Sequence, residues 1–355
     1  MDENSQRYLP TFLDTQGGMD LESDESSEDE KQDDKAGKMV YLQKCEEMGL
    51  VPVSQVLKYL FSEELHITHY GVGVRGVAAL AAALKVNRTV SILRLGDNNL
   101  GGAGCKLVCE ALEDNLIVQE LDLSDNHLGQ PDGLSSRTSL HKLFSDNSCN
   151  IHTLVLRSNK LSDADAVMIA SALGGNQTVT SLDVSKNCFG EKGGIAWGNM
   201  LQGASHVTDL NLGWNMLRSK GALAIAEGVK ANAVIEVLNL GWNGLGDEGF
   251  MVVAEALATN TTIVDLILSC NGASVKGAIG LAEGLKQNES LASLEIDQNS
   301  INEEGGEAVK EAMYANRGVL SLKMDQTNTS DELREELASL MKQRRIAQSR
   351  GEKAP

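Results

Sequence analysis

The sequence predicts an α/β solenoid, a horseshoe of about ten strand–helix units with a parallel sheet on the concave face. Three observations support this fold class: a recurring Leu-x-Leu pattern, an Asn five positions after its first Leu, and an amphipathic helical pattern completing each unit. The Leu-x-Leu pattern, or a near equivalent, begins at Leu65, Leu93, Leu121, Leu154, Leu182, Leu210, Leu238, Leu266, Leu294 and Leu322. Successive starts are 28 residues apart, with a single interval of 33. Such self-similarity at a fixed period is the signature of a repeat architecture.

Each unit follows from simple geometry. Leu-x-Leu places both leucines on one face of a short strand, and the Asn amide can bond backbone groups left open in the following turn. A helix then returns the chain to the next parallel strand, as in GFMVVAEALATN at 249–260. Strands stack about 4.8 Å apart and helices about 8–10 Å apart, so the array must curve with its strands inside. Small residues near the helix ends, such as Gly228 and Gly284, are predicted to let each helix lie close to the sheet.

The chain divides into four segments. Residues 1–38 carry 12 acids against 4 bases and are predicted to be an acidic disordered tail. Within it, Ser26 and Ser27 each precede an acid by three residues, which suits an acid-directed kinase, although a purely solubilising tail explains the composition equally. Residues 39–64 are predicted to form a helical N-terminal cap, broken at Gly49 and Pro52. Residues 65–329 hold the repeats.

Two departures from the regular period stand out. The unit that starts at Leu121 carries five extra residues around 129–139, predicted to be a rim loop that is either functional or merely tolerated. Residues 330–355 are predicted to be a C-terminal helix and basic tail, with Lys342, Arg344 and Arg345 complementing the helix dipole. Its apolar residues, Leu333, Leu337, Leu340 and Met341, are expected to seal the last repeat; a separate basic docking helix is the alternative.

Units of this length with the pattern LxLxxNxL and a full helix resemble the ribonuclease-inhibitor class of leucine-rich repeats, over roughly 65–327. The segment YLQKCEEMGLVPVSQVLKYL at 41–60 further resembles the leucine-rich repeat-containing protein 74 group. The resemblance implies protein interaction rather than catalysis. Related repeat proteins serve in cilia, in innate sensors and as activators of the Ran GTPase.

Charge narrows the class of partner. The formal charge of −19 disfavours nucleic acid and anionic membranes, and no run approaches the roughly 20 apolar residues of a membrane helix. The side chains that face the hollow of the arc include 13 acids against four bases. We therefore expect a monomer whose protein partner has a basic surface, although charge needed for solubility explains the same count. Six cysteines without CxxC spacing and an N-terminus without signal-peptide character indicate a cytoplasmic protein, with cilium association as a further option.

One pair of residues is the sharpest candidate site. Trp214 and Trp242 occupy the same place in adjacent units, so their indoles are expected to stack at the inner rim, outside a core already filled by leucines. Adjacent exposed tryptophans commonly mark a binding hot spot; mutual packing under a neighbouring side chain is the alternative. The predicted protein-binding residues are Trp214, Trp242, Lys186, Asp183, Asp209, Glu236 and Asp265, and Cys270 continues the Lys–Trp–Trp row. Trp197 is predicted to lie in the core.

Catalysis is not indicated. The sequence has no GxSxG, HExxH or GxxxxGK[ST] motif, and its carboxylates are spread along the arc rather than paired. His66 and His69 are spaced poorly for a metal and could instead meet Glu63 or Glu64. We predict no catalytic residue, cofactor or metal. The rivals to a non-enzymatic scaffold or adaptor are a Ran-activator-like activator of a small GTPase, for which Arg94 and Arg157 are available, and an axonemal or ciliary structural component.

Overall fold

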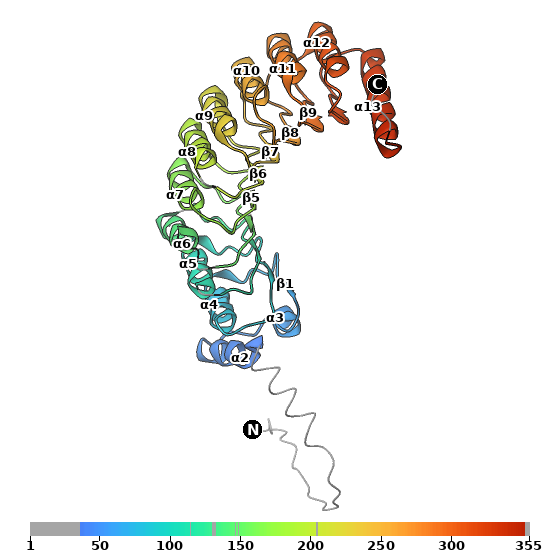
Figure 1. The fold of residues 1–355 in the computed structure, drawn as a ribbon. Coiled ribbons are helices and arrows are strands. Elements are labelled where there is room, and N and C mark those ends of the chain that lie inside the picture. Colours follow the sequence, from blue (N-terminus) through green and yellow to red (C-terminus); the bar gives the residue numbers. More distant parts are fainter. Residues whose placement is uncertain are drawn as a thin grey trace, which may run out of the picture.

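The protein forms a curved arc with strands lining its inner side and helices covering its outer side (Figure 1). The computed structural model describes residues 36–351 apart from 114, 130–132, 146, 148 and 204. Ten parallel strands form one sheet in chain order, β1 to β10, and a helix follows each strand. The predicted α/β solenoid is confirmed. The acidic tail predicted for 1–38, with Ser26 and Ser27, lies outside the described residues up to position 35.

The strands are three residues long and the helices mostly about three turns. The strands are β1 (Glu64–His66), β2 (Ile92–Arg94), β3 (Glu120–Asp122), β4 (Thr153–Val155), β5 (Ser181–Asp183), β6 (Asp209–Asn211), β7 (Val237–Asn239), β8 (Asp265–Ile267), β9 (Ser293–Glu295) and β10 (Ser321–Lys323). The helices are α2 (Lys38–Glu47), α3 (Ser54–Tyr59), α4 (Gly73–Leu84), α5 (Gly101–Leu112), α6 (Gly133–Ser145), α7 (Asp163–Leu173), α8 (Glu191–Gln202), α9 (Arg218–Ala231), α10 (Gly246–Leu257), α11 (Val275–Gln287), α12 (Asn302–Ala315) and α13 (Asp331–Ser349).

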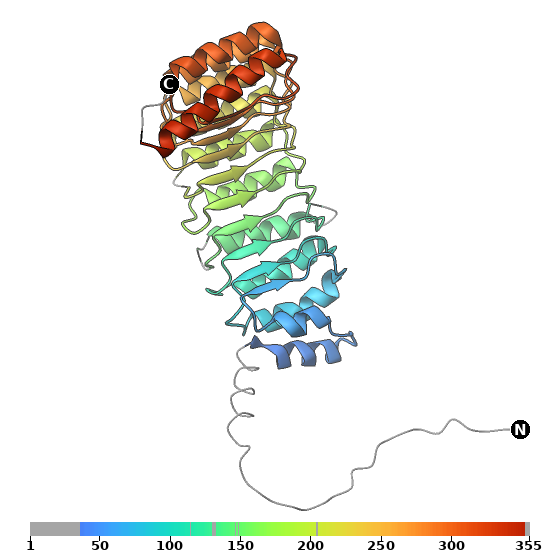
Figure 2. The same cartoon turned by 90° about the vertical axis from the view of Figure 1, so that its right-hand side faces the viewer.

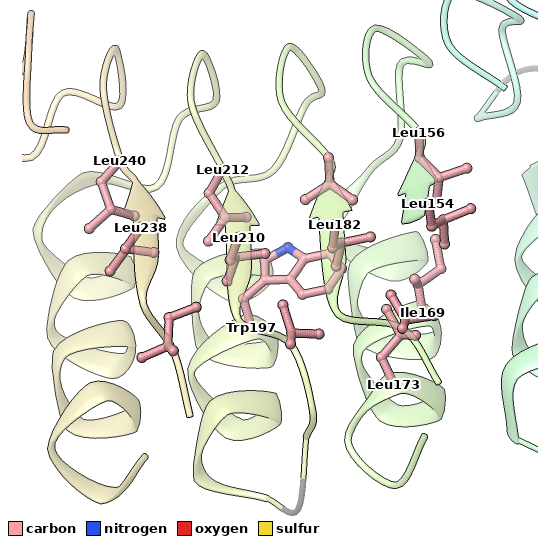
Figure 3. Close-up of a cluster of buried hydrophobic side chains, with 14 of the residues drawn as sticks. Leu154, Leu156, Ile169, Leu173, Leu182, Trp197, Leu210, Leu212, Leu238 and Leu240 are labelled. Carbon is pink, nitrogen blue, oxygen red and sulfur yellow. The ribbon is translucent and has the colours of Figure 1, made fainter. Parts of the chain in front are cut away.

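The core lies between the sheet and the helices. The leucines of neighbouring strands pair in register, as Leu210 does with Leu238, and their side chains are buried. Figure 2 shows the strands crossing the inner face one above another. Trp197 of α8 fills the space behind the strands among these leucines (Figure 3) and is fully buried, with its ring edge-on to Phe189. Its predicted place in the core is confirmed.

The asparagines after the strands form the predicted ladder. The Nδ2 of Asn243 donates to the carbonyl oxygens of Leu212 in the preceding unit and Leu240 in its own unit. Asn271 repeats the arrangement one unit on, so the oxygen of Leu240 accepts from two amides. Because no strand neighbour reaches these turns, the amides satisfy the backbone there. A second ladder, which our reading of the sequence missed, runs along the helix C-termini through Asn260, Asn288 and Asn316.

Small residues bring neighbouring helices together. A Cβ added to Gly228 would lie 2.5 Å from the carbonyl oxygen of Gly198 in α8, and one added to Gly284 would lie 2.3 Å from that of Ala254 in α10. The backbone each glycine approaches is therefore that of the preceding helix. The prediction that these residues serve contact with the sheet was wrong, because it considered packing within one unit and not crowding between units.

Both ends of the array are closed by helices. At the N-terminal end, α2 and α3 are tied together by the hydroxyl of Tyr41, which accepts from the backbone N–H of Val53. At the C-terminal end, Ser330 caps α13 by accepting from the N–H of Leu333. The apolar face predicted to seal the last repeat (Leu333, Leu337, Leu340 and Met341) is buried.

Two local expectations need correction. Arg344 is not part of an exposed basic tail: its side chain is buried and donates to the carbonyl oxygens of Met313 and Val319 in the last repeat, and burial lowers its pKa. The loop predicted around 129–139 is shorter than expected, because residues 133–139 already belong to α6. Residues 130–132 are outside the described part of the chain.

Candidate protein-binding surface on the concave face

The residue before each ladder position, from unit to unit, has a left-handed backbone. The φ angles of this row, which includes Lys186, Trp214, Trp242 and Cys270, lie between 49° and 66°. A left-handed backbone is costly for residues other than Gly, Asn and Asp, by roughly 1 kcal/mol or more. Trp214 (φ 59°) and Trp242 (φ 60°) therefore stand where backbone preference does not favour a large aromatic residue.

The two indoles are stacked as predicted. Their ring centroids are 3.9 Å apart with 9° between the planes, and the residues remain 47% and 39% exposed. The Nζ of Lys186 lies 5.2 Å from the ring centroid of Trp214, in cation–π range. Lysine, Trp214 and Trp242 thus make a continuous row across three units, with both rings accessible from the hollow of the arc.

The floor beneath the rings is uncharged. In neighbouring units a carboxylate closes the strand end: Asp183 Oδ1 accepts from the N–H of Ser185. Under the tryptophans the same bonds are made by amides, with Asn211 Oδ1 accepting from Gly213 and Asn239 Oδ1 from Gly241. A Cβ on Gly213 would lie 3.2 Å from both amide oxygens. The glycine therefore leaves bare backbone and two neutral amides facing the hollow. We call Lys186, Trp214, Trp242, Asn211 and Asn239 the Trp patch.

Four carboxylates surround the Trp patch: Asp183, Asp209, Glu236 and Asp265. The first, second and fourth are on the strands β5, β6 and β8, and Glu236 directly precedes β7. Within the described part of the chain none of the four has an ion-pair partner. Elsewhere on the concave face the acids are compensated: Arg94 contacts Glu64 at 2.7 Å and Glu120 at 3.4 Å. The uncompensated negative charge is therefore concentrated beside the tryptophans.

The structure brings all seven predicted binding residues onto the same face, in neighbouring strands. Sequence reasoning missed Asn211 and Asn239, which make the floor neutral. A signal for them exists, because the pentapeptide NLGWN occurs twice, at 211–215 and 239–243, and spans strand, floor and ring together. It also missed Ile267, a partly exposed apolar side chain one strand beyond Asn239.

The other candidate residues are engaged elsewhere. His69 Nδ1 lies 2.6 Å from Asp97 Oδ2 of the next unit, not beside Glu63 or Glu64, whereas His66 lies 4.0 Å from Glu64. Across 36–351, with the gaps given above, no three His, Cys, Asp or Glu side chains gather as a metal site would need. Among the helices described, none has both the length and the hydrophobicity that crossing a bilayer requires.

Comparison with known proteins supports the fold. The leucine-rich repeat family model matches residues 86–109, 147–170, 175–196, 203–226 and 231–254. The leucine-rich repeat-containing protein LegL7 of Legionella pneumophila is 19% identical, with 84% of this chain and 94% of that chain covered at a TM-score of 0.50. Two further structures are a Rad7 and Elc1 complex in yeast (13% identity, 90% and 91% covered, TM-score 0.46) and leiomodin-1 actin-binding site 2 (17% identity, 45% and 92% covered, TM-score 0.41). The fold is thus a leucine-rich-repeat solenoid.

Proposed function

We propose that this protein is a non-enzymatic interaction scaffold or adaptor that binds a protein partner on its concave face, with the Trp patch as the anchor. The observation that carries the proposal is the exposed indole stack. Neither the core nor the backbone calls for Trp214 or Trp242, since both rings lie outside the leucine layer and both residues have a left-handed φ. Exposed aromatic pairs of this kind are enriched at interface hot spots.

The chemistry of the surface supports a partner with a basic surface. Stacked rings over a neutral floor supply an area that can be dehydrated at low cost, while Asp183, Asp209, Glu236 and Asp265 attract cationic side chains at its border. Because these carboxylates lack counter-ions in the described structure, association should slow as ionic strength rises.

The finer assignments are also proposals. The 28-residue period with a full helix in each unit supports the ribonuclease-inhibitor class, and the segment at 41–60 supports the leucine-rich repeat-containing protein 74 group. We propose a cytoplasmic, possibly cilium-associated, monomer that does not bind nucleic acid. The axonemal component and the small-GTPase activator stay as alternative functions. Arg94, one of two arginines available to an activator, is held between Glu64 and Glu120.

The test is partner capture with the full chain and the double variant Trp214→Ala/Trp242→Ala. We expect partners held by the wild type to be lost, and the purified partner to bind at least about 30-fold more weakly, because a hot-spot side chain contributes about 2 kcal/mol or more. Tyr70→Ala, which removes another exposed aromatic residue, is the matched control. Undiminished capture by the double variant would refute the proposal. Stimulated GTP hydrolysis across a panel of small GTPases would favour the activator instead.

A further inference from the structure

A second apolar feature lies on the opposite, outer surface. Val167, Ile195, Leu223, Met251 and Ile279 follow one another at intervals of 28 residues, one on each helix from α7 to α11. All five are exposed, by 37–52%. The helices that carry them lie side by side along the outer side of the arc (Figure 1). We call these five residues the outer stripe.

The outer stripe has definite ends. At the equivalent place the next helix, α12, carries the exposed Glu307, and α5, two units before Val167, carries the exposed Lys106. A charged residue is what a solvent-facing helix position ordinarily holds. The apolar residues are therefore confined to five consecutive units, and contiguous exposed apolar surface of this kind marks an interaction site.

Shallow grooves accompany the stripe. One of about 330 Å³ lies between α7 and α8 and is bordered by Val167 and Ile195. Another of about 300 Å³ lies between α9 and α10, beside Leu223 and Met251. A third of about 320 Å³ lies between α10 and α11, where Gly280 stands beside Met251. Each groove could receive an apolar side chain from a segment that runs across the helices.

Charged rows of opposite sign flank the stripe. On the side of the helix N-termini, three residues before the stripe positions, are the exposed Lys192, Lys220 and Lys276, interrupted by Glu248 in α10. On the other side, four residues after the stripe positions, are the exposed Glu227, Glu255 and Glu283. Lys230 and Lys286 contact this acidic row but leave it with excess negative charge.

We propose that the outer stripe docks an amphipathic α-helix of a partner protein, lying across α7–α11, with acids along one flank of its apolar face and bases along the other. Packed helices are about 8–10 Å apart and curvature spreads their outer surfaces, whereas every seventh residue of an α-helix recurs after about 10.5 Å. One apolar residue per heptad therefore meets each successive unit. The acids of the partner helix face the lysine row, and its bases face the glutamate row.

The shape of the surface excludes a second copy of this chain as the occupant. The outer surface is convex, so two copies placed back to back would touch over one or two helices and leave the rest of the stripe open. A single helix of about 28 residues can cover all five units, because long helices bend gently to follow a surface.

The test uses a designed, fluorescently labelled helix of four heptads, with leucines on one face, Glu along one flank and Lys along the other. We expect saturable binding to the full chain, weakened at least about tenfold by Ile195→Asp/Leu223→Asp/Met251→Asp. The matched control replaces exposed apolar residues off the stripe, Val86→Asp/Leu116→Asp/Val234→Asp, and should bind like the wild type. If the triple stripe variant fails to fold, Leu223→Asp alone carries the comparison.

Three results would overturn the proposal. The first is no saturable binding of the mixed-charge peptide, and the second is equal binding by the stripe variant. The third is a concentration-dependent dimer in sedimentation that the stripe variant abolishes, which would make the stripe a self-association surface. A peptide with Glu on both flanks should bind more weakly than the mixed one. The Trp214→Ala/Trp242→Ala variant should bind the peptide normally, so this test and that of the concave face fail independently.

Discussion

Replacing one ladder asparagine tests how the inner face is held in shape. Asn243 is 1% exposed, and its Nδ2 donates to the carbonyl oxygens of Leu212 at 2.9 Å, Leu240 at 3.1 Å and Gly241 at 3.2 Å. Each such bond contributes about 1 kcal/mol net, so Asn243→Ala should cost about 3 kcal/mol of the free energy of unfolding. The assay is urea unfolding followed by circular dichroism.

Two companion variants make the measurement specific. Asn239→Ala removes the neighbouring, partly exposed asparagine, which accepts one bond from Gly241, and should cost less than about 1 kcal/mol. Asn243→Asp keeps the shape but replaces the donating amide by a carboxylate facing carbonyl oxygens, so it should destabilise more than Asn243→Ala at neutral pH. Equal costs for Asn243→Ala and Asn239→Ala would refute the account of the ladder.

Three further predictions concern the frame of the solenoid. Burial alone would raise the pKa of Asp247, but bonds from Ser274 and Gly277 outweigh it and lower the pKa, so the stabilisation from this carboxylate is present above the ordinary Asp range and lost as pH falls through it; Asp247→Ala should flatten the acid limb of the stability–pH curve, and an unchanged limb would contradict this. Arg344→Ala should detach α13 and raise amide hydrogen exchange in β10, because two buried carbonyl oxygens lose their donor; unaltered exchange would show that the apolar face suffices. Cys109, whose pKa is raised by its contact with Cys105 and by burial, should resist maleimide at neutral pH while the exposed Cys188 reacts, and mass spectrometry of the labelled peptides checks the order.

The repeat architecture could be predicted because a fixed period removes most of the topological choice. Once Leu-x-Leu recurs every 28 residues, in-register pairing such as Leu210 with Leu238 and the stacking of Trp214 on Trp242 follow from strand spacing alone. The core position of Trp197 followed from its helical phase.

What escaped prediction depends on contacts between units. Arg344 fits the pattern of a basic residue that complements a helix dipole, and only the position of α13 against the last repeat directs it to Val319. The glycine contacts Gly228–Gly198 join separate helices, which periodicity within one unit does not describe. The binding role of the Trp patch remains a proposal, because position and exposure do not identify what covers a surface.

The most direct test of the central claim maps where a partner lies. A photo-crosslinking amino acid is placed at Asn239, on the floor of the Trp patch, and separately at Leu116, an exposed position outside both proposed surfaces. For any partner whose capture requires Trp214 and Trp242, the account predicts crosslinks from position 239 and none from position 116. Crosslinks that avoid position 239 while capture still depends on the tryptophans would contradict it.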